Sequence, residues 1–206
     1  MDMKYKLTDE TKVVNNITLH RIECVTAFDD IECGAKGGWI ESEKNLSQRG
    51  NAWVSGNAWV RDKAVVSGNA WVRDNAKVCG NARISGNATV CGNAWVCGNA
   101  EVCGNARISG NAEVCGNAWV GENAMVCENA DYIVFKNWWS SGRYFTWTRS
   151  NNKWTVGCFY GSGEELIKKA YKDSEKSGLE YERVVNYVND ILKEDNDNGN
   201  RNKREG

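Results

Sequence analysis

Hydrophobic positions between Gly50 and Cys127 recur every six residues. The stretch holds thirteen consecutive six-residue units without an insertion, and a fourteenth, ENADYI, begins at Glu128. In all thirteen units the fifth residue is Val or Ile and the third is Ala. A β-branched residue suits a pleated strand whose side chain faces inward, and the alanine indicates a second inward position with room for a methyl group.

This fixed six-residue period is typical of a parallel β-helix. Each unit supplies one short strand and one corner, and the Gly-Asn pair that opens most units accepts left-handed backbone angles. Three strands close a triangular coil of 18 residues. Stacking at ~4.8 Å then gives about four and a half coils and a prism ~22 Å tall. The backbone hydrogen bonds are expected to run along the prism axis.

The flanking segments predict smaller elements. Residues 1–33 read as a β cap that covers the first open rung, with strands at 11–14 and 17–22 joined at Asn15-Asn16. Residues 34–133 form the β-helix, including a degenerate first coil in which Asn45 and Leu46 take the Asn and Ala places. Residues 134–193 form a ββαα module, and the Asn- and charge-rich residues 194–206 are expected to be a disordered tail.

In the C-terminal module, residues 143–149 and 153–160 read as two strands. Capping boxes at 162–165 and 177–180 predict the starts of two helices. The second helix has an apolar stripe formed by Tyr181, Val184, Val185, Val188, Ile191 and Leu192. We expect that stripe to pack on the strands or on the last coil.

Composition narrows the class of protein. The formal net charge of −1 favours neither nucleic acid nor an anionic membrane as a partner. No apolar run approaches the ~20 residues of a membrane span, and the N-terminus lacks the apolar core of a signal peptide. The nine cysteines are therefore expected to be reduced thiols in a cytosol.

The fourth residue of each unit faces outward, and residues 18 apart stack in a column. The first column is Trp53, Trp71, Thr89, Arg107 and Met125; the second is Trp59, Lys77, Trp95, Glu113 and Asp131; the third is Val65, Arg83, Glu101 and Trp119. Outward tryptophans expose much apolar area, which usually marks an interface. Three interpretations stay open: a protein interface that includes self-trimerisation, mutual stacking with cation–π contact to Lys77, and a ligand site of aromatic and cationic side chains.

The columns provide a first candidate for a partner-binding face. It consists of Trp53, Trp59, Trp71, Lys77, Arg83, Trp95 and Trp119. A second candidate lies in the C-terminal module and consists of Trp138, Trp139, Tyr144 and Trp147.

The sixth position holds six cysteines, of which Cys79, Cys97 and Cys115 share one column and Cys91 and Cys127 another. A structural zinc site needs four ligands, usually at close Cys-Cys spacing, and no histidine lies in the coils. Serine alternates with cysteine at this position, so we expect small filling residues and neither a metal nor a cofactor. Disulfides between adjacent rungs satisfy the Cα distance rule but not the expected compartment.

The segment before the repeats resembles the opening of uncharacterised hexapeptide-repeat proteins of phages, prophages and bacteria. Those proteins carry a Gly-Gly-aromatic-aliphatic-Glu-X-Glu-X-Asn-Leu-Ser-Gln leader, matched here by Gly37, Gly38, Trp39, Ile40, Glu41, Glu43, Asn45, Leu46, Ser47 and Gln48. Ala35 departs from the acidic residue expected there. The resemblance extends through the repeats to Ala130-Asp131-Tyr132-Ile133 and, more weakly, to Cys158–Ser162 and Glu165-Leu166. It implies a left-handed β-helix, and the group has no settled activity.

Three functions from different classes follow. The first is a non-enzymatic phage-type protein that docks a host protein or complex, with inhibition of a defence system, as by anti-CRISPR proteins, as one form of it. The second is a structural homo-oligomer, for which a trimer is expected. The third is an acyltransferase, since many left-handed β-helix proteins resemble one another in a catalytic histidine and a loop extruded from the coils. Here His20, in the N-terminal cap, is the only histidine, and the coils have no insertion.

Overall fold

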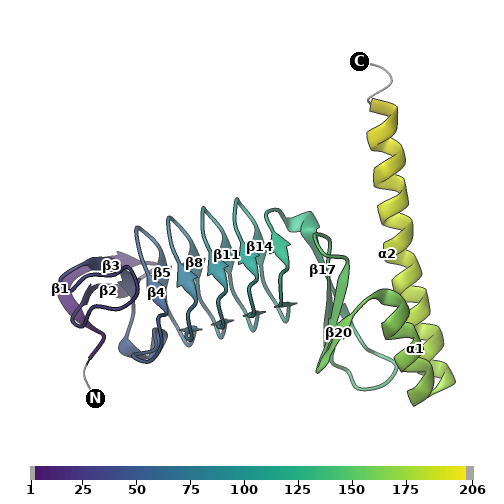
Figure 1. The fold of residues 1–206 in the computed structure, drawn as a ribbon, viewed down its shortest axis with the longest axis horizontal. Helices are drawn as coiled ribbons and strands as arrows, with labels where there is room; N and C mark the ends of the chain where they lie inside the picture. The colour runs from purple at the N-terminus through teal and green to yellow at the C-terminus, as the bar shows by residue number, and fades with distance from the viewer. Residues whose placement is uncertain (1–2, 203–206) are drawn as a thin grey trace.

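The computed structural model describes residues 3–202 and shows a β-solenoid between a β cap and a C-terminal module of strands and helices (Figure 1). Three parallel sheets form its sides. Their strand orders are β3-β5-β8-β11-β14, in which β3 is Lys36–Ile40, then β4-β7-β10-β13-β16, and β6-β9-β12-β15. The coil strands are β4 (Trp53–Val54), β5 (Trp59–Val60), β6 (Val65–Val66), β7 (Trp71–Val72), β8 (Lys77–Val78), β9 (Arg83–Ile84), β10 (Thr89–Val90), β11 (Trp95–Val96), β12 (Glu101–Val102), β13 (Arg107–Ile108), β14 (Glu113–Val114), β15 (Trp119–Val120) and β16 (Met125–Val126). The predicted mainly β solenoid is confirmed.

The core of the solenoid consists of the two inward positions of each unit. Strands 18 residues apart pair in register, as Val72 does with Val54 and Val90. The Val and Ile side chains of the fifth position are 0% exposed, and the alanines are at most 1% exposed. Both inward assignments are therefore confirmed.

The corners correct one expectation. The left-handed backbone belongs to the first residue of each unit alone, which is glycine with φ of 62–71° in most units and Asp62, Asp74 or Glu122 in three. The asparagine that follows serves another purpose, because its side chain donates to the asparagine one coil further on. Asn69 Nδ2 thus donates to Asn87 Oδ1 at 3.0 Å, and Asn87 Nδ2 to Asn105 Oδ1 at 2.9 Å. Asparagine ladders therefore run along the corners.

The N-terminal cap is a hairpin that extends one side of the solenoid. Strands β1 (Tyr5–Val14) and β2 (Ile17–Cys24) turn at Asn15 and Asn16, both with positive φ, as the Asn-Asn turn predicted. Strand β3 (Lys36–Ile40) pairs antiparallel with β2 and parallel with β5. The short helix η1 (Glu43–Asn45) follows, and Leu46 bridges to Val66, so Leu46 takes a Val place and not the expected Ala place.

The first rung is closed by donor side chains. Residues whose side chains face outward donate their backbone N–H to carbonyls of the next coil, as Trp53 N does to Ala70 O. The carbonyls of the first coil therefore have no preceding coil to donate to them. Lys4 Nζ donates to Gly50 O and Ala52 O at 3.1 and 2.8 Å. Asn45 Nδ2 donates to Asp62 O and Ala64 O at 3.1 and 2.9 Å. The expected covering of the first rung is therefore present in atomic detail.

The last rung is closed by acceptor side chains, because it leaves N–H groups open. Trp119 N donates to Thr146 Oγ1 at 2.9 Å, and Met125 N to Ser150 Oγ at 2.7 Å. The amides of Glu113, Cys115 and Cys127 likewise donate to Asn129 Oδ1, Tyr132 Oη and Asp131 Oδ2. The chemistry of each cap thus matches the backbone group that its end of the solenoid exposes.

The C-terminal module differs from the predicted ββαα arrangement. After the short helix η2 (Asn129–Asp131) it has four antiparallel strands, namely β17 (Tyr132–Lys136), β18 (Tyr144–Thr148), β19 (Lys153–Val156) and β20 (Phe159–Gly161). The predicted strand at 153–160 is split by a turn in which Gly157 has φ of 56°. Residues 132–133, expected to end the β-helix, begin this sheet.

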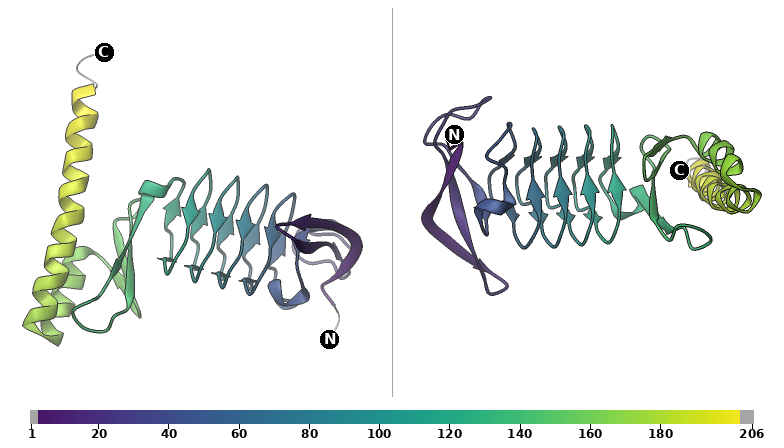
Figure 2. Two further views of the ribbon diagram at one scale, coloured as in Figure 1. Left: turned by 180° about the vertical axis from the view of Figure 1, so that it is seen from behind. Right: turned by 90° about the horizontal axis from the view of Figure 1, so that it is seen from below.

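Two helices cover the sheet on the side away from the coils (Figure 2). Helix α1 (Gly163–Asp173) begins at the predicted capping box of Ser162 and Glu165. Helix α2 (Glu175–Asn202) starts earlier than predicted, because Ser174 and not Ser177 accepts a first-turn amide, that of Ser177. It also continues through residues 194–202, where a disordered tail was expected; residues 203–206 lie outside the described part of the chain. No helix in residues 3–202 is long and apolar enough to cross a membrane.

Candidate functional site

Two of the predicted partner-binding tryptophans are buried. Trp53 is 1% exposed beneath the cap, edge-on to Tyr5 and Phe28 at ring-centroid distances of 6.4 and 5.5 Å. Trp59 is 8% exposed in a cluster with Trp39 and the hairpin, and the Arg61 guanidinium lies 5.2 Å from its ring. The prediction that these two tryptophans are exposed, on which the binding prediction rested, is therefore wrong, because the cap covers the first coils.

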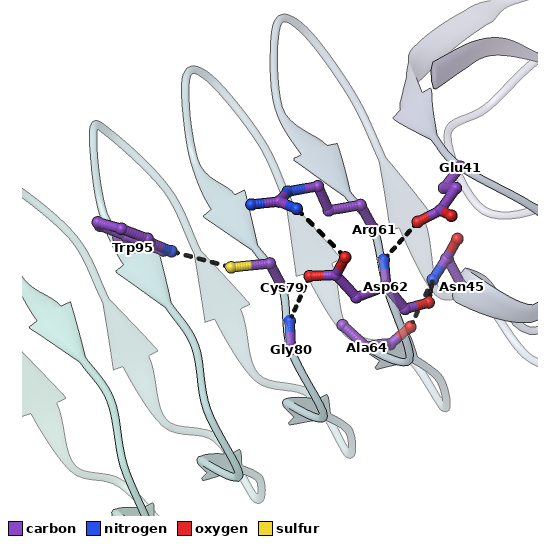
Figure 3. A network of polar contacts seen from close by, with 8 residues as sticks. All are labelled: Glu41, Asn45, Arg61, Asp62, Ala64, Cys79, Gly80 and Trp95. Carbon is purple, nitrogen blue, oxygen red and sulfur yellow. Dashed lines mark hydrogen bonds and ion pairs between the residues drawn. The ribbon is translucent and has the colours of Figure 1, made fainter. Parts of the chain in front are cut away.

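The other positions of the first candidate face are scattered along the solenoid. Trp71 is half-buried against the main core, and Trp119 is half-buried at the junction with the C-terminal sheet. Lys77 and Arg83 are exposed in different sheets. Trp95 is 39% exposed, and its Nε1 donates to Cys79 Sγ at 3.2 Å (Figure 3). The structure does not bring these residues together as one face.

The loop between β17 and β18 carries the most exposed tryptophan in residues 3–202, Trp138, at 70%. Its ring lies edge-on to Trp139 with 6.0 Å between ring centroids. Tyr144, at the end of the loop, is 43% exposed under Lys136 Nζ, which lies 5.7 Å from the ring. We call Trp138, Trp139 and Tyr144 the loop aromatic surface.

The loop aromatic surface is supported by the core of the module. Trp139 packs edge-on against Tyr181 and Phe145 at 5.0 and 6.2 Å between ring centroids. Trp139 Nε1 is buried and has no hydrogen-bond partner in the described structure. Trp147, the fourth predicted residue of this face, is 0% exposed and belongs to the core between sheet and helices. It supports the face and is not available for contact.

A pocket of about 340 Å³ lies beside this loop. The loop contributes Asn137, Ser140 and Arg143 to its lining, and the helices contribute Lys169 and Tyr181. Tyr181 Oη accepts a hydrogen bond from Asn137 Nδ2 at 3.0 Å, which joins the loop to α2. Burial raises the pKa of Tyr181 above its ordinary value.

His20 lies in the cap, on β2 and opposite Ile40. Its Nδ1 lies 3.4 Å from Thr8 O. It lines none of the pockets described for residues 3–202. These contacts place His20 in the cap and not on a coil.

The cysteine column corrects the expectation of reduced thiols. Cys97 and Cys115, on adjacent coils, form a disulfide with 4.7 Å between their Cα atoms. Cys79, in the same column, is a buried free thiol. The ligand atoms of Cys97, Glu113 and Cys115 lie within 4.8 Å of one another, a grouping that could hold a metal ion only with the disulfide reduced.

The sequence pattern missed the features at both ends of the solenoid. Trp39 pairs in register with Trp59, but the two are 20 residues apart, so a period of 18 does not align them. Buried Lys4 and Thr146 are unremarkable in sequence, and only the fold places them at open backbone groups. The departure from the repeat at Tyr132, where Val or Ile is expected, is the one signal that could have located the second cap.

The coils are similar to known proteins. A family model described as YdcK Beta solenoid repeat matches residues 76–92, 82–98 and 106–122. The chain is also 34% identical over 59 residues to a protein of Escherichia coli (strain K12) named "Uncharacterized acetyltransferase YdcK". That match covers 25% of this chain and 18% of the relative, so the chain spans less than a fifth of the relative's length. Sequence similarity and structure agree that this chain is a β-solenoid repeat protein.

Proposed function

We propose that this chain is a non-enzymatic binding protein that docks a protein partner through the loop aromatic surface. The observation that carries the proposal is the 70% exposure of Trp138; Tyr144, at the end of the same loop, is 43% exposed. Large exposed apolar side chains are unfavourable in water, and Trp and Tyr are the residues that most often dominate binding energy at interfaces.

Rigidity of the surface supports this proposal. Trp139 packs against Tyr181 and Phe145, so little of its side-chain freedom would be lost on binding, and Trp138 lies edge-on to it. The neighbouring pocket gives a partner side chain a place to insert.

Affinity capture from an Escherichia coli lysate tests the proposal. The tagged full chain is compared with Trp138→Ala, Tyr144→Ala and the matched control Trp95→Ala, which removes an exposed tryptophan of the coils. We expect the control to retain the captured proteins. We expect Trp138→Ala to lose about 2 kcal/mol of binding free energy, a roughly 30-fold weaker complex, because exposed aromatic anchors carry most of an interface.

Two results would contradict it. Identical captured proteins for all variants would show that neither tryptophan binds. If Trp95→Ala loses the captured proteins while Trp138→Ala retains them, the binding face lies on the coils. Thermal melts of each variant distinguish lost contacts from lost folding.

Acyl transfer is a second candidate, favoured by the name of the relative with 34% identity. Against it, residues 3–202 contain one histidine, and it lies in the cap. Calorimetry with acetyl-CoA decides the point. Binding that is abolished in His20→Ala would favour the enzyme over the binding protein.

Two narrower predictions belong to the same proposal. A phage-type role that inhibits a host defence system rests on the resemblance of the leader segment between Gly37 and Gln48. A plaque assay on a strain with active CRISPR–Cas tests it. Self-association as a trimer in the host cytoplasm stays a prediction that light scattering on the purified chain tests.

A further inference from the structure

Three cysteines occupy the same corner position on three consecutive coils. Cys79 N donates to Val96 O, and Cys97 N donates to Val114 O, so each cysteine lies one rung from the next. The Cys97–Cys115 disulfide spans 4.7 Å between Cα atoms, which is the rung spacing itself. Because the coils repeat, Cys97 has an equivalent cysteine neighbour on each side.

The surroundings hold both outer sulfurs near the column. Cys79 Sγ accepts the indole N–H of Trp95 at 3.2 Å, and Trp95 belongs to the coil of Cys97 (Figure 3). Cys97 packs against the cluster that contains Cys79. At the other end, Cys115 Sγ lies 3.4 Å from Glu113 Oε1, which can accept a hydrogen bond from the Cys115 thiol once the disulfide has opened.

We propose that this column is a thiol–disulfide exchange site in which the disulfide moves between two rung positions. The Cys79 thiolate attacks Cys97 Sγ, the Cys97–Cys115 bond breaks, and a Cys79–Cys97 bond forms. Cys115 leaves as a thiolate and takes up the proton that Cys79 released. One disulfide and one thiol exist before and after, so the step consumes neither oxidant nor reductant.

The stacking geometry favours this step. Cys79 and Cys115 lie on opposite sides of Cys97 along the solenoid axis, so the attacking sulfur approaches from the side opposite the leaving sulfur. The second cysteine column lacks this property, because Ser109 separates Cys91 from Cys127. Cys91 and Cys127 are two rungs apart, which is ~9.6 Å, and a disulfide spans at most ~7 Å between Cα atoms.

Disulfide mapping of the full chain tests the proposal. Cleavage after Lys77, Arg83, Arg107 and Lys136 places Cys79, Cys97 and Cys115 in separate peptides. After air oxidation, acid quenching and alkylation, we expect the parent to contain both linkages, with the minor one at about one tenth or more, since both span one rung. A parent in which Cys79 is alkylated throughout, with Cys97–Cys115 as the sole linkage of the column, would overturn the proposal.

Cysteine and serine variants test whether disulfides form only between adjacent rungs of the folded chain. Treated with oxidised glutathione, Cys115→Ser should form Cys79–Cys97, whereas Cys97→Ser should leave Cys79 and Cys115 unlinked. Ser109→Cys should create a disulfide with Cys91 or Cys127 and serves as the positive control for adjacent rungs. If Ser109→Cys forms a bond while folded Cys115→Ser keeps Cys79 and Cys97 as thiols, the exchange proposal is wrong.

Discussion

At the scale of single residues, each place in the repeat has its own physical demand. The Val, Ile and Ala positions follow from inward packing, and their burial could be predicted from periodicity alone. The glycine corner is stricter, because a side chain there must accept positive φ and avoid the next coil. Asp62 and Asp74 meet that demand, since each carboxylate accepts the amide of the glycine one coil on, Gly80 or Gly92, at 2.9 Å (Figure 3).

Substitutions at two corner glycines distinguish the cost of positive φ from the cost of a clash with the next coil. Gly116 has φ of 71° and nothing within 4 Å of an added Cβ, so Gly116→Ala should lose about 1 kcal/mol for the left-handed backbone. At Gly86 the added Cβ would lie 2.8 Å from Gly104 O, so Gly86→Ala should lose about 1–3 kcal/mol more. Gly86→Asp should recover part of that loss by accepting the Gly104 amide. Urea denaturation measures all three, and equal losses for both alanine variants would refute the steric argument.

At the scale of elements, the sequence predicted strands better than caps. The hairpin turn at Asn15-Asn16 and the capping box at Ser162 are local signals, and both are confirmed. Strand β17 depends on its pairing with β18, a tertiary contact that local patterns do not contain. The early start of α2 is itself a local cap at Ser174, which the capping-box pattern at 177–180 led us to overlook. The exposure of the tryptophans could not be predicted for the same reason: the cap that buries Trp53 begins 48 residues earlier in the chain, at Tyr5.

The cap makes a prediction about pH. Burial lowers the pKa of Lys4 from 10.5 to about 8. Between these values the unfolded chain binds more protons at Lys4 than the folded chain does, so the free energy of unfolding should rise with pH. Burial raises the pKa of Tyr5, which reverses the trend only above its ordinary value of 10.

Urea denaturation from about pH 7 to about pH 10 under reducing conditions checks this sign. The parent should gain stability relative to Lys4→Met as pH rises, whereas Lys63→Met, at an exposed corner, should follow the parent. A stability difference between parent and Lys4→Met that does not change with pH would contradict the buried position of Lys4.

At the scale of the whole molecule, the solenoid has a direction. Its carbonyls face the N-terminal cap and its outward amides face the C-terminal sheet, so stacking alone would leave two unlike open ends. Lys4 and Asn45 close one end with donors, and Thr146 and Ser150 close the other with acceptors. Closed ends oppose end-to-end growth and leave the sides and the loop aromatic surface for a partner.

Amide hydrogen exchange at the last rung tests this closure most directly. Thr146 is 0% exposed, so Thr146→Val keeps the packing but leaves the Trp119 amide without an acceptor, at a cost of roughly 1–3 kcal/mol. We predict that the Trp119 and Met125 amides are as protected in the parent as those of the central coils. Thr146→Val should speed exchange at Trp119 by about tenfold or more while Met125 stays protected by Ser150. Fast exchange of the Trp119 amide in the parent, at the rate of an unstructured chain, would contradict the account of a solenoid closed at both ends.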